Sequence, residues 1–350
     1  MLYKLLSVAK HQGHTLGINI GDYVQALASS QFYPRVDGFL DRDTDLASYD
    51  GAPCKIIMNG WYMHNPANWP PSDKIDPLFV AVHINSLAKD ALTTPESINY
   101  FKKHEPIGCR DHYTMELLKK KGVDAYFSGC MTLTLGMTYR TDEVEDKTYI
   151  VDPVYNAKMN ATRILQACGI WLSHPVDVMK LLLKEHLHVH AGNNWLYKVL
   201  KTALYYEEYS RVFGRDIVMK SEYVCQEHLY YYRNFRDDEA RFKEAKRLVK
   251  NYAKAKLIIT SRIHCALPCL GMGTPVIYLE RGTDTKASSC RLGGLKDLFN
   301  VMYVNNGHLV PQFDTTLPIT KDNPPENKDS WRTIADKLID RCKAFIAKAD

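Results

Sequence analysis

Residues 260–280 read TSRIHCALPCLGMGTPVIYLE and place an arginine and a histidine between two apolar runs. The runs at 256–259 and 275–279 are short and rich in Ile, Leu and Val, which predicts two buried strands. Between them, apolar side chains recur at helical spacing, at Ile263, Ala266, Leu267 and Leu270. The stretch therefore predicts a strand–helix–strand unit whose two strands are parallel.

The limits of this short buried helix follow from its flanking residues. Ser261 is placed to cap its start, and Gly271 and Gly273 suit its end. Pro268 has no N–H, so the carbonyl of His264 is expected to lack its usual helical partner.

Arg262 and His264 fall in the first helical turn, at the carboxyl end of the first strand. Ligands bind at that edge in open α/β sheets, and the free N–H groups of a helix start favour anions. A surface arginine and a core histidine would explain the same pattern without any function. The rest of the chain has to decide between these interpretations.

The composition is that of a soluble globular protein. A chain of 350 residues is long for one core, which favours two domains. The formal net charge of +5 is too small to indicate a nucleic-acid partner. The nine cysteines form no Cys-x-x-Cys pair and indicate free thiols in a reducing cytoplasm. Neither a secretory signal nor an apolar run of transmembrane length is recognisable.

Strands and helices alternate along both halves of the chain. In the first half, strands are predicted at 15–18, 55–58, 78–84 and 124–127, and helices at 23–30, 96–103 and 113–121. The acidic stretch 141–147 is interpreted as a linker. Beyond it, strands are predicted at 149–151 and 216–219, helices through most of 156–209 and at 241–255, and an amphipathic helix around 331–342.

This alternation predicts an α/β protein with two Rossmann-like domains. The first domain is expected to span residues 1–145 and the second 146–310, with residues 311–350 forming a tail and a helix that packs back across both. The arrangement is similar to that of GT-B glycosyltransferases, whose active site lies between two such domains.

Two further stretches place polar residues beside predicted strands. Asn19, Gly21 and Asp22 follow the first strand; glycine allows a close backbone approach, and the carboxylate can cap the helix or face a ligand. Arg110 follows another short strand, and Asp111 can cap the next helix. Two arginines at strand ends in separate domains indicate a shared anionic ligand.

Two weaker patterns do not support a metal site. His186, His188 and His190 would share one face of a strand, but beyond Glu185 no carboxylate or second cluster accompanies them. The Asp41-Arg42-Asp43 stretch resembles the Asp-x-Asp of metal-dependent sugar transferases, yet it lies in an acidic loop. No metal is therefore expected.

Taken together, the motifs resemble those of the polysaccharide pyruvyl transferase family. The matching stretches are Asn19-Ile-Gly21-Asp22, Cys109-Arg110-Asp111, Ser261-Arg262-Ile263-His264 with Gly273-Thr274-Pro275-Val276-Ile277 after it, and a lysine shortly beyond the last strand, Lys286. The similarity spans roughly residues 14 to 300 and is most specific at Ser-Arg-x-His.

The resemblance implies that phosphoenolpyruvate donates its pyruvyl group to a saccharide, usually as a ketal across two hydroxyls, in the synthesis of a surface or capsular polysaccharide. Arg262 would hold the anionic donor, and His264 would protonate the enol carbon C3 so that a sugar hydroxyl can attack C2. The other residues expected to contact substrate are Arg110, Asn19, Gly21, Asp22, Ser261, Glu280 and Lys286.

The same resemblance implies the partners and the location. The donor is a substrate, so no cofactor is expected; the acceptor is a saccharide, with a lipid-linked form as one option. The location is cytoplasmic, with peripheral attachment to the inner face of the membrane as a further option. Two alternatives stay open: a GT-B nucleotide-sugar glycosyltransferase, in which Arg262 would hold a diphosphate, and a catalytically silent saccharide-binding protein of the same fold.

Overall fold

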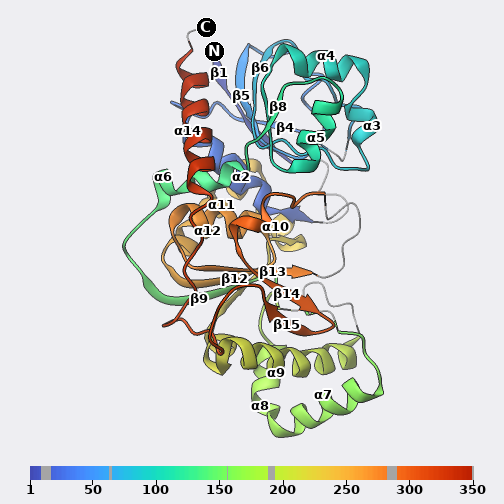
Figure 1. The fold of residues 1–350 in the computed structure, drawn as a ribbon, viewed down its shortest axis with the longest axis vertical. Coiled ribbons are helices and arrows are strands. Elements are labelled where there is room, and N and C mark those ends of the chain that lie inside the picture. The colour runs from blue at the N-terminus through green and yellow to red at the C-terminus, as the bar shows by residue number, and fades with distance from the viewer. Residues whose placement is uncertain (9–16, 63–64, 156, 188–193, 282–289, 349–350) are drawn as a thin grey trace.

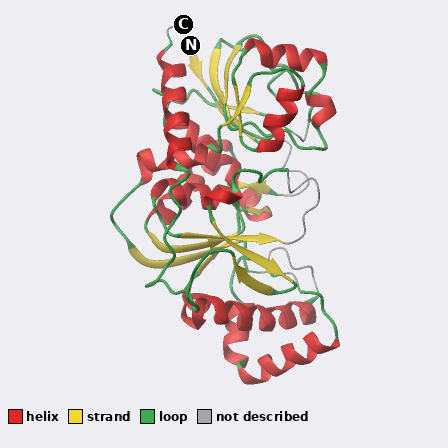
Figure 2. Cartoon of the chain, viewed as in Figure 1, coloured by secondary structure: helices red, strands yellow, loops and turns green. Residues whose placement is uncertain are grey.

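The computed structural model describes residues 1–8, 17–62, 65–155, 157–187, 194–281 and 290–348. The chain is an α/β protein in which parallel sheets are covered by helices (Figures 1 and 2). Within the described residues, no helix is both long and apolar enough to cross a bilayer.

The N-terminal part contains small parallel sheets. Its strands are β1 (Leu2–Tyr3), β5 (Cys54–Met58) and β6 (Ile75–Phe79) in the order β1-β5-β6, with two separate pairs, β2 (Leu5–Ser7) with β4 (Phe39–Asp41) and β7 (Ile107–Cys109) with β8 (Ala125–Phe127). Its helices are α2 (Ile20–Ser30), α3 (Lys89–Leu92), α4 (Pro95–Lys103) and α5 (His112–Lys120). The predicted helices and the strands at 55–58 and 124–127 are confirmed within a few residues.

The remaining strands of this half differ from the prediction. The strand predicted at 78–84 is wrong at both ends, because β6 begins at Ile75 and ends at Phe79. Ala81 takes a left-handed conformation with φ of 55°, which an extended strand cannot accommodate. The strand predicted at 15–18 lies partly outside the described residues; β3 (Ile18–Asn19) pairs antiparallel with β11 (Glu227–His228).

A six-stranded sheet forms the C-terminal part. Its order is β10-β9-β12-β13-β14-β15, and only β14–β15 pairs antiparallel among these neighbours. The strands are β9 (Glu145–Val151), β10 (Glu222–Val224), β12 (Ala255–Thr260), β13 (Val276–Arg281), β14 (Asn300–Asn305) and β15 (His308–Pro311). The helices are α7 (Ala161–Ser173), α8 (Pro175–Leu182), α9 (Trp195–Lys220), α10 (Leu229–Asn234), α11 (Asp238–Ala253) and α12 (Ile263–Met272).

Both faces of this sheet are buried, which explains its apolar strands. Ile258 of β12 packs into the core that contains α11 and α12, whereas Leu257 and Ile259 pack into the core that contains α7, α8 and α9. Neighbouring residues of a strand point to opposite faces, so a strand covered on both sides must be apolar throughout.

The unit at residues 255–281 is confirmed as strand, helix and parallel strand, with Ile258 beside Val276. The cap assignment was wrong, because the N-cap residue of α12 is Arg262 and the Ser261 hydroxyl instead donates to the Asp152 carbonyl at 2.6 Å. The helix ends at Gly273, whose φ of 85° is left-handed.

Two other predictions are corrected. The strand predicted at 216–219 is the last part of α9, where Ile217 and Val218 are buried against the sheet core and Lys220 pairs with Asp216 one turn away. The short apolar run Ile217-Val218-Met219 fits either periodicity, and helix packing decides here. The acidic linker is shorter than predicted, because β9 already begins at Glu145, which pairs with Ala255.

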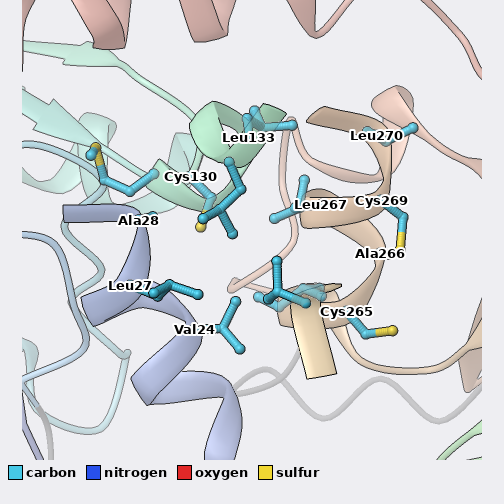
Figure 3. Close-up of a cluster of buried hydrophobic side chains, with 14 of the residues drawn as sticks. Val24, Leu27, Ala28, Cys130, Leu133, Cys265, Ala266, Leu267, Cys269 and Leu270 are labelled. Atoms are coloured by element: carbon cyan, nitrogen blue, oxygen red, sulfur yellow. The ribbon is translucent and has the colours of Figure 1, made fainter. Parts of the chain in front are cut away.

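One hydrophobic core joins the N-terminal helices to the C-terminal sheet. It brings together α2, the 3-10 helix η1 (Met131–Leu135) and α12, through residues such as Val24, Leu133 and Leu267 (Figure 3). The last helix, α14 (Arg332–Ala347), packs on η1, where Cys342 Sγ lies 3.8 Å from Met131 Sδ. The predicted C-terminal amphipathic helix is therefore confirmed.

Helix α12 crosses the chain at η1 and the short helix α6 (Gly136–Tyr139) in direct backbone contact. A Cβ on Gly136 would lie 2.0 Å from the Gly271 carbonyl oxygen, and a Cβ on Gly271 would lie 2.2 Å from the Leu133 carbonyl oxygen. Both distances are far inside van der Waals contact, so only glycine fits at either position. Gly271 thus serves the packing of α12 and not its end.

We expect Gly271→Ala to destabilise the protein by about 1–3 kcal/mol or more, because the added methyl group forces α12 away from η1. Urea denaturation monitored by circular dichroism measures this loss. The matched control is Gly169→Ala in α7, where an added Cβ meets no atom within 4 Å. That variant should be unchanged or more stable by roughly 0.5–1 kcal/mol. Equal stability of the two variants would contradict the packing argument.

Candidate functional site

Arg110 lies at the carboxyl end of β7 and is 1% exposed. Its backbone N–H donates to the Val82 carbonyl at 2.8 Å, which fixes the residue beside β6. Its side-chain Nε and Nη2 are buried and have no hydrogen-bond partner among the described residues. A buried guanidinium with free donors is costly, and a bound anion is the ligand that would offset this cost.

His264 faces the same region from the first turn of α12 and is 7% exposed. Its Nε2 has no hydrogen-bond partner among the described residues. A Cβ at Gly21 would lie 3.0 Å from His264 Cβ, so the glycine makes room for the imidazole. The His264 carbonyl, which Pro268 leaves without a helical donor, accepts from the Gln226 amide at 3.5 Å.

The electrostatic surroundings keep His264 neutral. Burial is the largest cause that lowers its pKa, and the positive charges of Arg110, Arg291 and Arg42 lower it further, to about 3. The charge of Asp22 acts in the opposite direction. These four charged residues therefore lie within electrostatic reach of the imidazole, although they come from distant parts of the sequence.

Arg42 and Asp22 form a buried ion pair next to this histidine. Arg42 Nη1 donates to Asp22 Oδ1 at 3.1 Å, and the same oxygen accepts from the Gln25 amide at 3.0 Å. Asp22 is not the cap of α2, as one prediction allowed, because the Asn19 side chain caps this helix by accepting from the Gly21 N–H at 3.0 Å. The Asp22 carboxylate is instead part of the charged cluster.

Arg262 is held by two carboxylates. Its Nε lies 2.6 Å from Asp152 Oδ2, and its Nη1 lies 2.9 Å from Glu227 Oε2. These partners position the guanidinium and compensate its charge. Arg110, which has no ion pair with a carboxylate among the described residues, is therefore the stronger attractor for an anion.

A family model for polysaccharide pyruvyl transferases matches residues 19–283, which is most of the chain. The chain belongs to this family. Comparisons with curated proteins and with solved structures give no match. The family membership makes the protein a transferase that moves pyruvyl groups onto polysaccharides, with phosphoenolpyruvate as donor and a saccharide as acceptor. The matched range includes Arg110, Arg262 and His264.

Glu280, another predicted site residue of the transferase, forms an ion pair with Lys296. Glu280 is buried in β13, and its Oε1 accepts a hydrogen bond from Lys296 Nζ. Within the described residues, no hydrogen bond or ion pair joins Glu280 to Arg110 or His264. Lys286 lies outside the described residues, as do His188 and His190 of the histidine cluster.

Four residues of the transferase's cluster escaped the sequence prediction: Arg42, Trp61, His83 and Arg291. The Arg291 guanidinium lies over the Trp61 ring, 4.6 Å from its centroid, and His83 Nδ1 lies 2.6 Å from Asp111 Oδ2. Arg42 follows β4, Trp61 lies beyond the end of β5 and His83 beyond β6. The rule that led to Arg110 and Arg262, a polar residue at the carboxyl end of a predicted strand, missed them, because no strand was predicted at 39–41 and His83 fell inside the strand predicted at 78–84.

We expect the buried His264 to make the transferase less stable in mild acid. Unfolded histidine takes up its proton near pH 6.5, whereas native His264 does so only near 3, so the unfolded state binds more protons between these values. Stability should therefore fall as the pH drops from about 6.5, by up to about 1.4 kcal/mol per pH unit for this residue.

Urea denaturation of the wild-type protein and His264→Asn at several pH values between neutrality and mild acid measures this effect. The free energy of unfolding of the wild type minus that of the variant should decrease as the pH falls. A difference that stays constant over this range would show that His264 is not held neutral in the folded protein.

Proposed function

We propose that the transferase binds phosphoenolpyruvate at the cluster around Arg110 and His264 and joins its pyruvyl group to two hydroxyls of one saccharide as a ketal, in the assembly of a surface or capsular polysaccharide. The observation that carries this proposal is the pair of buried, unpartnered groups: the Nε and Nη2 of Arg110 and the Nε2 of His264, which have no hydrogen-bond partner among the described residues. The Arg110 guanidinium can bind an anion, and the His264 imidazole can exchange a proton.

We propose that Arg110 binds phosphoenolpyruvate through the N–H groups of its guanidinium. Phosphate and carboxylate both match the geometry of a guanidinium, which binds them through two parallel hydrogen bonds. Arg262 would complete the clamp from the start of α12, in the orientation that Asp152 and Glu227 give it. The residues proposed to line the remaining substrate surface are Asn19, Gly21, Asp22, Ser261, Glu280 and Lys286.

His264 is proposed to be the acid that protonates C3 of the donor. Without a ligand it is neutral, because burial and three arginines lower its pKa. Bound phosphate and carboxylate offset these positive charges, so donor binding favours proton uptake by the imidazole. Transfer of this proton to C3 makes C2 electrophilic, and a sugar hydroxyl can then attack it.

We also propose a two-domain, GT-B-like division of the chain. Residues 1–145 would form the first domain, 146–310 the second, and 311–350 the tail whose helix packs back. The separation of the N-terminal sheets from the six-stranded sheet supports this division (Figure 1).

We further propose that the saccharide acceptor is lipid-linked and that the transferase attaches to the inner face of the membrane.

Two variants should separate donor binding from turnover. Arg110→Lys keeps a charge but loses the fork, so phosphoenolpyruvate should raise its melting temperature much less than that of the wild type. His264→Ala should keep the donor-induced shift but lose turnover by roughly 10²–10⁴-fold, as expected when a general acid is removed. Turnover is measured as phosphate release and ketal formation with a panel of p-nitrophenyl glycosides, by mass spectrometry.

Arg332→Lys is the control, because Arg332 lies on the exposed start of α14 and pairs only locally with Asp329. It should match the wild type in both measurements. If phosphoenolpyruvate does not stabilise the wild type and a nucleotide sugar does, the proposed donor is wrong. If His264→Ala lowers the melting temperature but keeps its activity, His264 is a packing residue and not the acid.

A further inference from the structure

His83 and Asp111 form a buried hydrogen-bonded pair next to Arg110. His83 Nδ1 lies 2.6 Å from Asp111 Oδ2, and both side chains are fully buried. A carboxylate can only accept, so Nδ1 carries the hydrogen and donates it to Asp111. The lone pair of the neutral ring is therefore on Nε2, and this atom has no hydrogen-bond partner among the described residues.

The pair belongs to the same cluster as His264. His83 forms a parallel bridge with Trp61, whose ring lies edge-on to the imidazole with 6.0 Å between centroids. Burial is the largest cause that lowers the pKa of His83, to about 4; the charges of Arg110 and Arg291 contribute, while the hydrogen bond to Asp111 opposes them. The same two arginines act on His264, so both histidines lie around one pair of cations.

We propose that His83, oriented by Asp111, is the base that accepts the proton of the attacking saccharide hydroxyl. The arrangement is a neutral imidazole whose Nδ1–H is fixed by a buried carboxylate and whose Nε2 is free to take a proton, as in Ser-His-Asp triads. Asp111 is a positioning residue in this scheme. The inference rests on the proposed function, because it assigns the base for that reaction.

Protons and electrons balance with two histidines in opposite roles. The hydroxyl O–H bond breaks, its proton passes to His83 Nε2, and its electron pair forms the C–O bond at C2. The C2–C3 double-bond pair takes the proton of His264 at C3. The phosphate then leaves C2 with the electrons of its C–O bond as the second hydroxyl adds, and it carries away that hydroxyl's proton as hydrogen phosphate. His83 gains one proton and His264 loses one, so the total number of protons on the two histidines is unchanged. Exchange with water then returns each histidine to its starting protonation state.

His83→Gln and Asp111→Asn test this role. The amide of His83→Gln can still donate to Asp111 but cannot act as a base, and asparagine keeps the cap of α5 at position 111. Each variant should lose roughly 10²–10⁴-fold in kcat with phosphoenolpyruvate and a p-nitrophenyl glycoside acceptor. The donor-induced rise in melting temperature should persist, and the double variant should be no slower than His83→Gln.

The control is His104→Gln, a half-buried histidine that packs on Tyr100 in the same part of the molecule. Its turnover should equal that of the wild type. Wild-type turnover per folded molecule in His83→Gln would overturn the role of His83, as would additive losses in the double variant. If the wild type transfers pyruvyl to no glycoside and does not bind the donor, the proposed function itself fails, and the inference falls with it.

A second, independent observation concerns the outer face of α7 and α8. These helices lie at the end of the molecule opposite the chain termini and bury one stripe against α9, through Ala167, Ile170, Val178 and Leu181 (Figure 1). Their other side carries a second apolar stripe at helical spacing. Its members are Leu165 (73% exposed), Leu172 (80%), Val176 (61%) and Leu183 (76%). Trp195 and Leu196 at the start of α9 are also largely exposed.

The sequence of this face carries more basic than acidic residues. Residues 161–201 contain the basic residues Arg163, Lys180, Lys184, Lys198 and Lys201 but only two acidic ones, Asp177 and Glu185. Asp177 is buried and paired with Arg215, whereas Glu185 is 80% exposed. Lys180 is exposed, while Arg163 donates to the Asn306 carbonyl and Lys184 to the Ser221 carbonyl. Exposed Leu and Trp with flanking Lys and Arg is the pattern of a helix that lies in a membrane interface. A second copy of the chain would bring two basic faces together, which disfavours a dimer.

The geometry points to the outer face of α7 and α8, with the start of α9, as a docking surface for an anionic lipid membrane. The apolar stripe would enter the headgroup region, and the exposed Lys180 would contact lipid phosphates. This inference does not depend on the reaction that the transferase catalyses.

Cosedimentation with vesicles tests the surface. The wild type should bind vesicles of phosphatidylcholine and phosphatidylglycerol, and added salt should weaken the binding. Leu172→Glu and Leu183→Glu should each lower the bound fraction several-fold, whereas Leu87→Glu, at a residue 78% exposed on the N-terminal part, should not. Absence of vesicle binding by the wild type would overturn the proposal. So would dimers in light scattering that Leu172→Glu dissociates, because a second copy would then cover the face.

Discussion

The contact of α12 with the backbone around η1 is the constraint on which the site depends. Gly271 and Gly136 let the helix lie against the carbonyl of Leu133, and Gly21 lets α2 approach the other end of the same helix. The three glycines thus determine how closely α12 approaches η1 and α2 and how it is oriented against them. His264 lies in the first turn of this helix, so its position in the charged cluster is determined by packing that lies mostly outside that cluster.

In the C-terminal sheet β12 and β13 could be predicted because they are largely apolar, whereas β10, β14 and β15 were not predicted. The run ending at Thr260 is covered on both faces, which gives a strong local signal that does not depend on distant contacts. The end of α9 could not be predicted in the same way. Ile217 and Val218 fit a strand or a helix equally well, and only their packing against the sheet selects the helix. The early end of β6 depends on the left-handed Ala81, a conformation with no signature in an alanine.

The site residues, too, could be predicted only where they adjoin a clear local pattern. Arg110 and His264 could be predicted because each adjoins a clear strand, whereas His83 lay inside a strand that was predicted to be longer than it is. Arg42 was noted only within a weak Asp-x-Asp pattern, and its ion pair with Asp22 joins residues 20 positions apart that the pattern does not connect. The sequence does not show which arginines are paired with carboxylates. Arg262 is paired with two, and Arg110 with none among the described residues. This difference distinguishes an arginine that is held by the fold from one that can bind an anionic ligand.

The position of α14 affects how the protein is made. Lys55 Nζ donates to the carbonyl of Phe345, a contact between residues 290 positions apart, so the end of α14 lies against β5 (Figure 1). During synthesis the N-terminal sheet emerges before α14, the helix that covers η1 and β5. We therefore expect the nascent chain to expose that surface until α14 has left the ribosome.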